Sequence, residues 1–263
     1  MTDRVLLGQY EPGDSFIHHV DPRIKILLTL FFMGSLFFME SFLAYLIVFL
    51  WILLVVFISK VQITRLVKGL KPIIGIVLFT FIINVLVTPG EELYKIWIFS
   101  ITRQGLIKAS FITVRIVLLV FGTTLLTLTT SPLQLTDGLE SLFKPLSLLG
   151  FPSHALAMMI SIALRFIPTL FDEADTISRA QKARGADFES GNIMQRAKAM
   201  VPLMVPLFLN SIQRAEDLAM AMEARCYRGG EKRTRLNPLH MQGKDWIVFF
   251  IHVFFFILLG LLF

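Results

Sequence analysis

Two arginines, Arg184 and Arg225, lie 41 residues apart in matching surroundings. The first belongs to the run Ala-Gln-Lys-Ala-Arg-Gly at 180–185, and the second to Ala-Met-Glu-Ala-Arg-Cys at 221–226. A guanidinium is a planar fork of five donors that lysine cannot reproduce, and it binds carboxylates or carbonyls in a groove of another protein. The alternative is a pair of solvated cations that favourably meet helix dipoles. The repeated small-x-x-small-Arg-small pattern, which leaves each guanidinium sterically free, favours the groove.

Each arginine ends a long stretch with helical periodicity, which must position it. Apolar residues recur every three or four positions in both stretches. In the first they are Met159, Ile162, Phe166, Leu170, Ala174, Ile177 and Ala180, and in the second Val201, Val205, Phe208, Ile212, Ala215, Leu218 and Met222. We expect helices over 153–186, capped by Ser153, and over 193–227, each roughly 50 Å long at about 1.5 Å per residue. We expect kinks at Pro168, Pro202 and Pro206, and we expect neither stretch to be long or apolar enough to span a bilayer.

The rest of the chain indicates a membrane protein, because 55% of its 263 residues are hydrophobic and only 17% are charged. The sequence predicts an all-α integral membrane protein with about five transmembrane helices and three cytoplasmic amphipathic helices. Asp21 and Pro22 form a helix start. The apolar runs that follow predict spans at 24–39, 43–59, 72–88, 107–128 and 246–263. The first two runs are short for spans, so we expect a tight hairpin in which one or both helices extend a turn beyond these limits.

Charge placement predicts the organisation and the orientation. Of the 25 Lys and Arg, 14 lie within 131–245 and four more within 60–71. By the positive-inside rule the N-terminus is cytoplasmic and the C-terminus lies outside. The chain then divides into 1–130, with four spans, a cytoplasmic helical block and basic linker at 131–245, and a last span at 246–263. Ser131 and Pro132 start a short first helix of that block, which ends near Gly150 and Pro152.

Other classes of function find little support in the sequence. The basic residues form no stripe interleaved with aromatics, which argues against nucleic-acid binding. Cys226 is the only cysteine, so no intrachain disulfide can form, and the five histidines have no metal-ligand spacing. No Gly-x-x-x-x-Gly-Lys-Ser/Thr loop is present, so the chain cannot bind ATP in that way.

These features together resemble the transmembrane T component of energy-coupling factor transporters, the vitamin and metal-ion importers of the ABC class. The hallmark of that family is a pair of arginine-centred triplets, typically Ala-Arg-Gly. The run 183–185 matches it fully, and 224–226 matches at Ala224 and Arg225 with Cys226 where glycine is frequent. The N-terminal run also resembles the opening of the family, with Tyr10, Pro12, Gly13, Ser15, His18, Asp21, Pro22, Arg23 and Lys25.

The resemblance implies a non-enzymatic subunit in the plasma membrane of a prokaryote. It implies two cytoplasmic ATPase partners, one seating Ala183, Arg184 and Gly185 and the other seating Ala224, Arg225 and Cys226. It implies one or several small substrate-binding membrane subunits as further partners, besides membrane lipid. This chain would bind no cofactor and no metal, because ATP and Mg²⁺ belong to the ATPases.

Methionines add a candidate docking surface. Seven of the eleven lie in the two long helical stretches and their joint. Methionine is flexible and polarisable, and surfaces rich in it accept several partners. We expect Met158, Met159, Met200 and Met204 to dock substrate-binding subunits, the alternative being ordinary packing between helices.

Three weaker candidates remain open. Asp172, Glu173 and Asp175 resemble one half of an acidic magnesium site, as in a Mg-dependent membrane transferase, although a matching second cluster is missing and local pairs with Arg179 or Lys182 also explain them. The permease subunit of an ordinary ABC importer is the second-ranked function. Arg115, inside the fourth predicted span, is either functional or snorkels to the surface.

Overall fold

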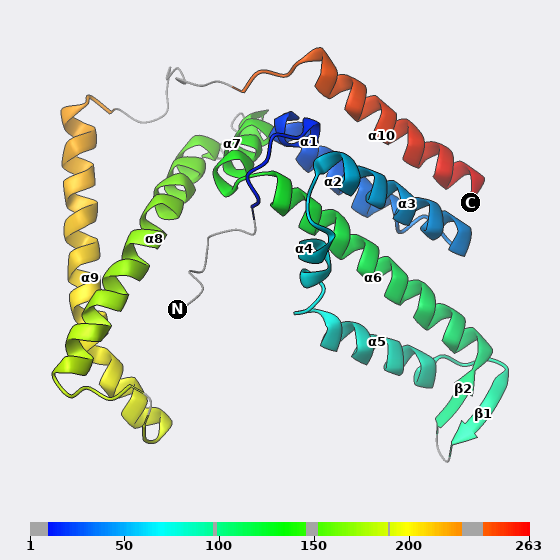
Figure 1. Cartoon of the computed structure of the whole chain (residues 1–263), viewed down its shortest axis with the longest axis horizontal. Coiled ribbons are helices and arrows are strands. Elements are labelled where there is room, and N and C mark those ends of the chain that lie inside the picture. The colour runs from blue at the N-terminus through cyan, green and yellow to red at the C-terminus, as the bar shows by residue number, and fades with distance from the viewer. Residues whose placement is uncertain (1–9, 97–98, 146–151, 189, 228–238) are drawn as a thin grey trace. The chain divides into compact units, whose positions relative to one another are not determined.

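The computed structural model describes residues 10–96, 99–145, 152–188, 190–227 and 239–263. In these residues the chain is almost wholly helical (Figure 1), which confirms the predicted class. The elements are α1 (Phe16–His19), α2 (Pro22–Ser35), α3 (Phe42–Ser59), α4 (Ile63–Lys68), α5 (Ile74–Val87), β1 (Glu92–Ile96), β2 (Phe99–Thr102), α6 (Arg103–Thr129), α7 (Pro132–Phe143), α8 (Ser153–Ala183), α9 (Ile193–Ala224) and α10 (Gly243–Leu262). The two strands, which the sequence did not predict, form a small antiparallel hairpin between α5 and α6.

The chain divides into two compact units. The membrane unit comprises Met1–Leu142 and Pro238–Phe263, and the arm unit comprises Phe143–Asn237. Helix α7 starts where predicted, with a capping box in which Ser131 Oγ accepts from the Gln134 amide and Gln134 Oε1 accepts from the Ser131 amide. It packs on the membrane unit, where Gly138 lies close to Pro22 and Ile26.

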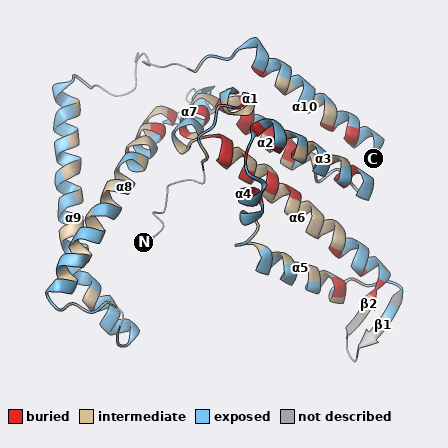
Figure 2. Cartoon of the chain, viewed as in Figure 1, coloured by how far each residue is buried: buried red, intermediate tan, exposed pale blue. Residues whose placement is uncertain are grey.

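The core of the membrane unit is formed mainly by α2, α3, α6 and α10. Buried side chains from these helices form one cluster, which includes Phe32, Tyr45, Val48, Leu118 and Phe256. The outer faces of the same helices are pale blue in Figure 2 and carry large apolar side chains, for example Phe57 at 85% exposure. Apolar side chains on the outside of an apolar helix are what lipid contact requires. This unit is therefore built to sit in a bilayer.

The first predicted span is shorter than expected. Asp21 caps α2 and Pro22 is its first residue, as predicted, but the helix ends at Ser35 after 14 residues. At about 1.5 Å per residue it covers about 21 Å, less than the ~30 Å of a hydrocarbon core. Residues 36–39 are apolar enough to continue a helix but belong to the connection to α3. The prediction of a helix over 24–39 is therefore wrong at its C-terminal end.

By length and composition, four helices of the described chain can cross a membrane: α3, α6, α8 and α10. Helix α5 is apolar but has only 14 residues. The presence of α8 in this set contradicts the expectation that neither arginine-ended stretch could span. The reason is an uneven distribution of charge, since Arg165 is the only Lys, Arg, Asp or Glu between Ser153 and Phe171. The charged residues of α8 are concentrated in its last third.

The start of α8 and the prolines inside α8 and α9 can be compared with the sequence predictions. Helix α8 begins at Ser153, but the prediction that Ser153 caps it is wrong, because Pro152 takes the cap position without a side-chain hydrogen bond. Prolines 168, 202 and 206 lie inside continuous helices. Figure 1 shows the yellow first part of α9 set at an angle to its long orange part. A bend of this kind is what internal prolines produce.

Arg115 of α6 has a structural role in the membrane unit. Its Nε donates to Tyr45 Oη at 2.9 Å, and its Nη2 donates to the Met39 carbonyl at 3.2 Å. Tyr45 Oη donates in turn to that same carbonyl at 3.0 Å. The guanidinium also lies 5.3 Å from the ring centroid of Phe37. Arg115 therefore fixes the connection between α2 and α3, which explains why apolar residues 36–39 leave the helix.

The N-terminal run forms a hydrogen-bonded cluster, which we call the N-terminal hub and which centres on Lys25. Lys25 is only 7% exposed. Its Nζ donates to the carbonyls of His18 at 3.2 Å and Thr129 at 3.1 Å, and to Thr130 Oγ1 at 3.3 Å. All three ammonium hydrogens thus have acceptors, and they join α1, α2 and the end of α6. A buried charge requires such complete pairing.

Two aspartates extend the hub to α10. Asp21 Oδ1 accepts from the Arg23 amide at 2.9 Å and so caps α2. The Asp21 amide donates to Asp245 Oδ1 at 3.2 Å, and Asp245 Oδ2 accepts from the Gln242 amide at 2.8 Å to cap α10. Each carboxylate meets the partial positive charge of a helix N-terminus. The starts of α2 and α10 are therefore linked through their caps.

His18 completes the hub. Its Nε2 donates to the Glu11 carbonyl at 3.0 Å, which leaves Nδ1 as the acceptor for Ser15 Oγ at 2.6 Å. The Glu11 amide donates to the Leu128 carbonyl at 3.0 Å, and the Glu11 carboxylate pairs with Arg65 of α4 at 3.3 Å. The residues that carried the sequence resemblance at this end thus hold the membrane helices together.

Candidate functional site

The two predicted arginines occupy the same position on two helices. Arg184 is the C-cap of α8, and Arg225 is the C-cap of α9. All six motif residues, 183–185 and 224–226, are exposed. In the part of the chain that the structure describes, neither guanidinium pairs with a carboxylate. Both forks are therefore presented to the surroundings.

The backbone after each arginine folds in the same way. In the first motif the Gly185 amide donates to the Lys182 carbonyl at 3.0 Å, and the Ala186 amide donates to the Gln181 carbonyl at 2.9 Å. In the second motif the bonds run from Cys226 to Glu223 at 2.8 Å and from Tyr227 to Met222 at 3.0 Å. This pair of bonds is the Schellman motif, which ends a helix with one left-handed residue. The triplet pattern in the sequence thus encodes a helix end as well as a free cation.

Gly185 and Cys226 are the left-handed residues, with φ of +90° and +58°. Glycine adopts this conformation without a steric penalty, whereas a side chain carries a cost of roughly 1–2 kcal/mol. Cysteine nonetheless takes the glycine conformation at the second site, so the loss of glycine leaves the geometry of the cap intact. Cysteine in place of the glycine of the Ala-Arg-Gly pattern therefore lowers the stability of this helix end but does not change its backbone conformation.

Cys226→Gly should therefore stabilise the end of α9 by about 1 kcal/mol, because it removes the left-handed penalty. Gly185→Ala should destabilise the end of α8 by a similar amount. Thermal unfolding in detergent, followed by circular dichroism of the helices, measures both changes. Cys226→Ser is the matched control, since it keeps the side-chain penalty and should melt with the parent protein. A Cys226→Gly protein that melts at or below the parent temperature contradicts the prediction.

Helices α8 and α9 contact each other in the arm unit through polar side chains. Glu173 of α8 accepts hydrogen bonds from Asn210 Nδ2 at 2.5 Å and from Arg214 Nη2 at 3.3 Å. Gln181 Nε2 of α8 donates to the Pro202 carbonyl of α9 at 3.4 Å. Gln181, Asn210 and Arg214 could not be predicted from the sequence, because nothing local marks a contact between helices.

The acidic cluster does not assemble as the transferase alternative requires. Glu173 pairs with Arg214 of the other helix. Asp172 and Asp175 are exposed. Among the described residues, no group of three or more His, Cys, Asp or Glu side chains could hold a metal ion. The geometry gives the Mg-dependent reading no support.

The candidate docking methionines lie on the arm helices at different depths. Met159, Met200 and Met204 are 54%, 51% and 56% exposed, whereas Met158 is half-buried. Met200 and Met204 are four residues apart on α9 and share one face. Exposed apolar residues, among them Val201, Val205 and Phe208, continue this surface along α9. A contiguous exposed apolar surface is typical of an interaction site.

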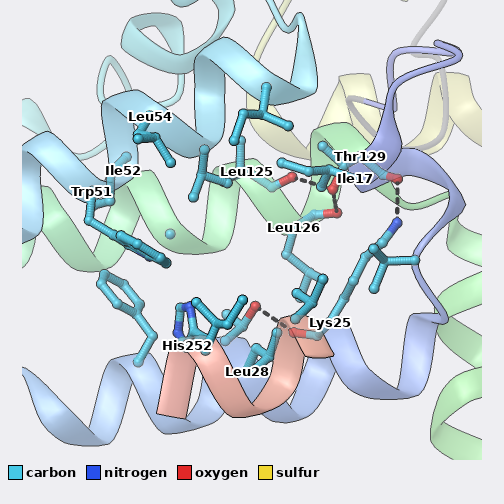
Figure 3. A pocket seen from close by; sticks show the side chains of 18 of the residues that line it. Ile17, Lys25, Leu28, Trp51, Ile52, Leu54, Leu125, Leu126, Thr129 and His252 are labelled. Carbon is cyan, nitrogen blue, oxygen red and sulfur yellow. Dashed lines mark hydrogen bonds between the residues drawn. The ribbon is translucent and has the colours of Figure 1, made fainter. Parts of the chain in front are cut away.

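The membrane unit contains an apolar cavity of about 230 Å³ between α2, α3, α6 and α10 (Figure 3). Figure 3 shows Trp51 and His252 at one end of it, and Lys25 at the other end with its ammonium turned to the Thr129 carbonyl. Leu28, Ile52, Leu54, Leu125 and Leu126 are among the lining residues. Small-molecule sites combine such walls with a few convergent polar groups. The lining of this cavity suits hydrocarbon.

Comparison with known proteins identifies the class that this fold and site define. The family model of CbiQ, a cobalt transport protein, matches residues 13–236. That range includes both arginine motifs and most of the N-terminal hub. The class is the membrane component of a transporter.

Relatives identify the family within that class. The chain is 54% identical over 249 residues to the energy-coupling factor transporter transmembrane protein EcfT of Clostridium kluyveri, covering 94% of this chain and 92% of the relative. It is 51% identical over 245 residues to EcfT of Thermosediminibacter oceani and 48% identical over 246 residues to EcfT of Bacillus subtilis, at 92–93% coverage of each chain. The chain belongs to the EcfT family of transmembrane proteins of energy-coupling factor transporters, which confirms the resemblance drawn from its motifs. It is therefore a prokaryotic multi-pass transporter component that works with other subunits.

Proposed function

We propose that this chain couples two cytoplasmic ATPases to a separate substrate-binding membrane subunit for the uptake of a micronutrient, a vitamin or a metal ion. The observation that carries the proposal is the matched pair of helix ends. Two long helices end in the same Schellman motif, and each presents an exposed arginine that pairs with no carboxylate in the described chain. A rigid helix with a free planar cation at its tip can enter a groove and transmit its movement.

In this mechanism other chains hydrolyse ATP, and this subunit is not catalytic. Arg184 seats in one ATPase and Arg225 in the other, and closure of the ATPase pair on ATP moves the two helix ends relative to each other. Helices α8 and α9 act as levers and reorient the substrate-binding subunit in the bilayer. ATP and Mg²⁺ are bound by the ATPases, because this sequence has no phosphate loop.

The charge distribution supports a topology for this arrangement. With 14 of the 25 Lys and Arg between 131 and 245, the positive-inside rule supports a topology in which the N-terminus, α7, α9 and the charged end of α8 are cytoplasmic and the C-terminus lies outside. The apolar first half of α8 is then available to an apolar partner or to the membrane surface. The arginine ends of α8 and α9 face the cytoplasmic motors.

Mass spectrometry of the proteins that co-purify with the tagged chain in mild detergent tests the proposal. Two different ATPases with one or more small membrane proteins are the expected result, and the identity of the small proteins indicates the substrate. A second copy of this chain with a single ATPase species would instead support an ordinary permease. Recovery without any ATPase would overturn the coupling function.

The exposed methionines form the proposed docking surface for the substrate-binding subunits. Met200→Ile with Met204→Ile should weaken recovery of some of these subunits more than others, because β-branched side chains adapt less well to different partners. The loss should be roughly tenfold or less, since volume-conserving swaps cost under about 1.5 kcal/mol. Quantitative mass spectrometry of co-purified subunits measures it. Met220→Ile, at a 60% exposed position of the same helix, is the control, and an equal loss of every subunit would count against the surface.

A further inference from the structure

Helices α8 and α9 are joined in the arm unit by an ion pair with two separate acceptor atoms. Glu173 Oε1 accepts from Asn210, and Glu173 Oε2 accepts from Arg214. The Glu173 side chain is 18% exposed and that of Arg214 is 37% exposed. A carboxylate held by two donors from one facing helix has little freedom to move along that helix. The contact therefore fixes one point of α8 against one point of α9.

A second contact between α8 and α9 arises because residue 206 of α9 is a proline. Pro206 has no amide hydrogen, so the Pro202 carbonyl, four residues earlier, loses its partner within the helix. Gln181 Nε2 of α8 donates to that carbonyl at 3.4 Å. The proline thus creates an acceptor on the surface of α9, and α8 supplies the donor.

The two contacts have a regular geometry. Glu173 and Gln181 are eight residues apart on α8, and Asn210 and Pro202 are eight residues apart on α9 in the opposite chain direction. The helices are therefore antiparallel over about two turns. Because they are antiparallel, the two arginine ends lie in opposite directions from the contact.

The Glu173–Arg214 pair is also equidistant from the two motifs. Arg184 follows Glu173 by 11 residues, and Arg225 follows Arg214 by 11 residues. Each helix therefore has an arm of three turns, about 16 Å, between the ion pair and its arginine. The offset between the paired residues is the same 41 positions that separates the two arginines.

We infer that the Glu173–Arg214 pair, with Asn210, is the fulcrum about which the two arginine ends move, and that the Gln181–Pro202 contact, three residues from Arg184, sets the resting angle of the α8 arm. The inference rests on the proposed coupling function, and it assigns positioning roles to residues outside the motifs. Movement of one arginine end is transmitted to the other through the ion pair, which lies 11 residues from each arginine. If the pair is lost, both arginines can still bind their partners, but movement of one arginine end no longer moves the other.

Spin labels test this with the assembled complex. Arg179→Cys and Met220→Cys, each five residues before its arginine, carry the labels in a Cys226→Gly background, and the distance between them is measured by pulsed electron resonance with and without MgATP. The parent complex should show an ATP-dependent shift. Glu173→Arg alone and Arg214→Glu alone should abolish the shift while the ATPases still co-purify, and the two together should restore it. Asp175→Arg, an exposed position of α8 two residues from Glu173, is the matched control.

A second cycle isolates the proline contact. Gln181→Ala should reduce the ATP-dependent shift in the parent protein but not in a Pro206→Ala background, because alanine at 206 supplies the amide that satisfies the Pro202 carbonyl. Equal effects of Gln181→Ala in both backgrounds would overturn the role of this contact.

The outcomes separate the fulcrum from the coupling function itself. A parent complex that contains no ATPase refutes the coupling function and the fulcrum together. If the parent complex assembles and shifts, single variants that shift like the parent overturn the fulcrum alone. Single variants that lose the ATPases also overturn it, since the pair would then only maintain the shape of the binding sites.

Discussion

An Arg184→Glu protein is expected to reach the membrane in normal amounts and to lose the ATPase subunits on purification. The guanidinium is exposed at the end of α8 and has no carboxylate partner in the described chain, so its replacement leaves the fold of the chain unchanged. Across an interface, however, reversal turns a charge-assisted pair into a like-charge contact that costs several kcal/mol. Co-purification measures the loss, which we expect to exceed roughly a hundredfold for a cost of about 3 kcal/mol or more.

Two further variants make the result specific. Arg184→Lys keeps the charge but not the fork, so it should retain part of the binding. Arg179→Glu is the matched control, because this exposed arginine lies on the same helix outside the motif. Arg225→Glu should behave like Arg184→Glu. Normal ATP-driven uptake by a protein that carries both reversals would refute the coupling mechanism.

A Lys25→Met protein is expected to lose a large share of its thermal stability. The substitution preserves volume but removes all three donors of the ammonium, and so leaves the His18 and Thr129 carbonyls without this partner. A buried acceptor that is left unsatisfied typically costs about 1–3 kcal/mol, so the loss of these two carbonyl contacts costs about 2–6 kcal/mol. That is a large share of the roughly 5–15 kcal/mol of stability that proteins have. Size-exclusion chromatography after heating in detergent measures the shift in melting temperature.

Lys68→Met is the control for that experiment. Lys68 is an exposed residue of α4, so its replacement should change stability by no more than about 0.5 kcal/mol. Equal melting temperatures of the two variants would show that the hub contributes nothing to stability. Thr130→Val should fall between them, because it removes only the third acceptor of Lys25.

The sequence predicted the features that depend on neighbouring residues. Asp21 with Pro22 marked the start of α2, and Ser131 with Pro132 marked the start of α7, because capping is a local interaction. The positions of Arg184 and Arg225 at helix ends were also predicted, since periodicity and small residues determine them. The left-handed conformation of Cys226 was not predicted. The only sign of it in the sequence was Gly185 at the equivalent position of the first motif.

Contacts between distant residues escaped the sequence analysis. Lys25 bonds to Thr129, 104 residues away, and Asp21 to Asp245, 224 residues away. Residues 36–39 were predicted to end a span, because their hydropathy gives no sign that Arg115 of another helix binds the Met39 carbonyl. Only the tertiary fold determines these partners. For a different reason, the sequence prediction missed that α8 is long and apolar enough to cross a membrane. The charged residues near its C-terminus outweighed the apolar residues of its first part.

The unequal caps give the two arginines different dynamics. A left-handed cysteine raises the free energy of the closed helix end by about 1 kcal/mol relative to glycine. The final turn of α9 then frays roughly five times as often as that of α8, if all else is equal. Under the proposed coupling function, an arm that frays more often releases its partner sooner. The two arginine ends, alike in shape, would therefore disengage in a preferred order, with Arg225 leaving before Arg184.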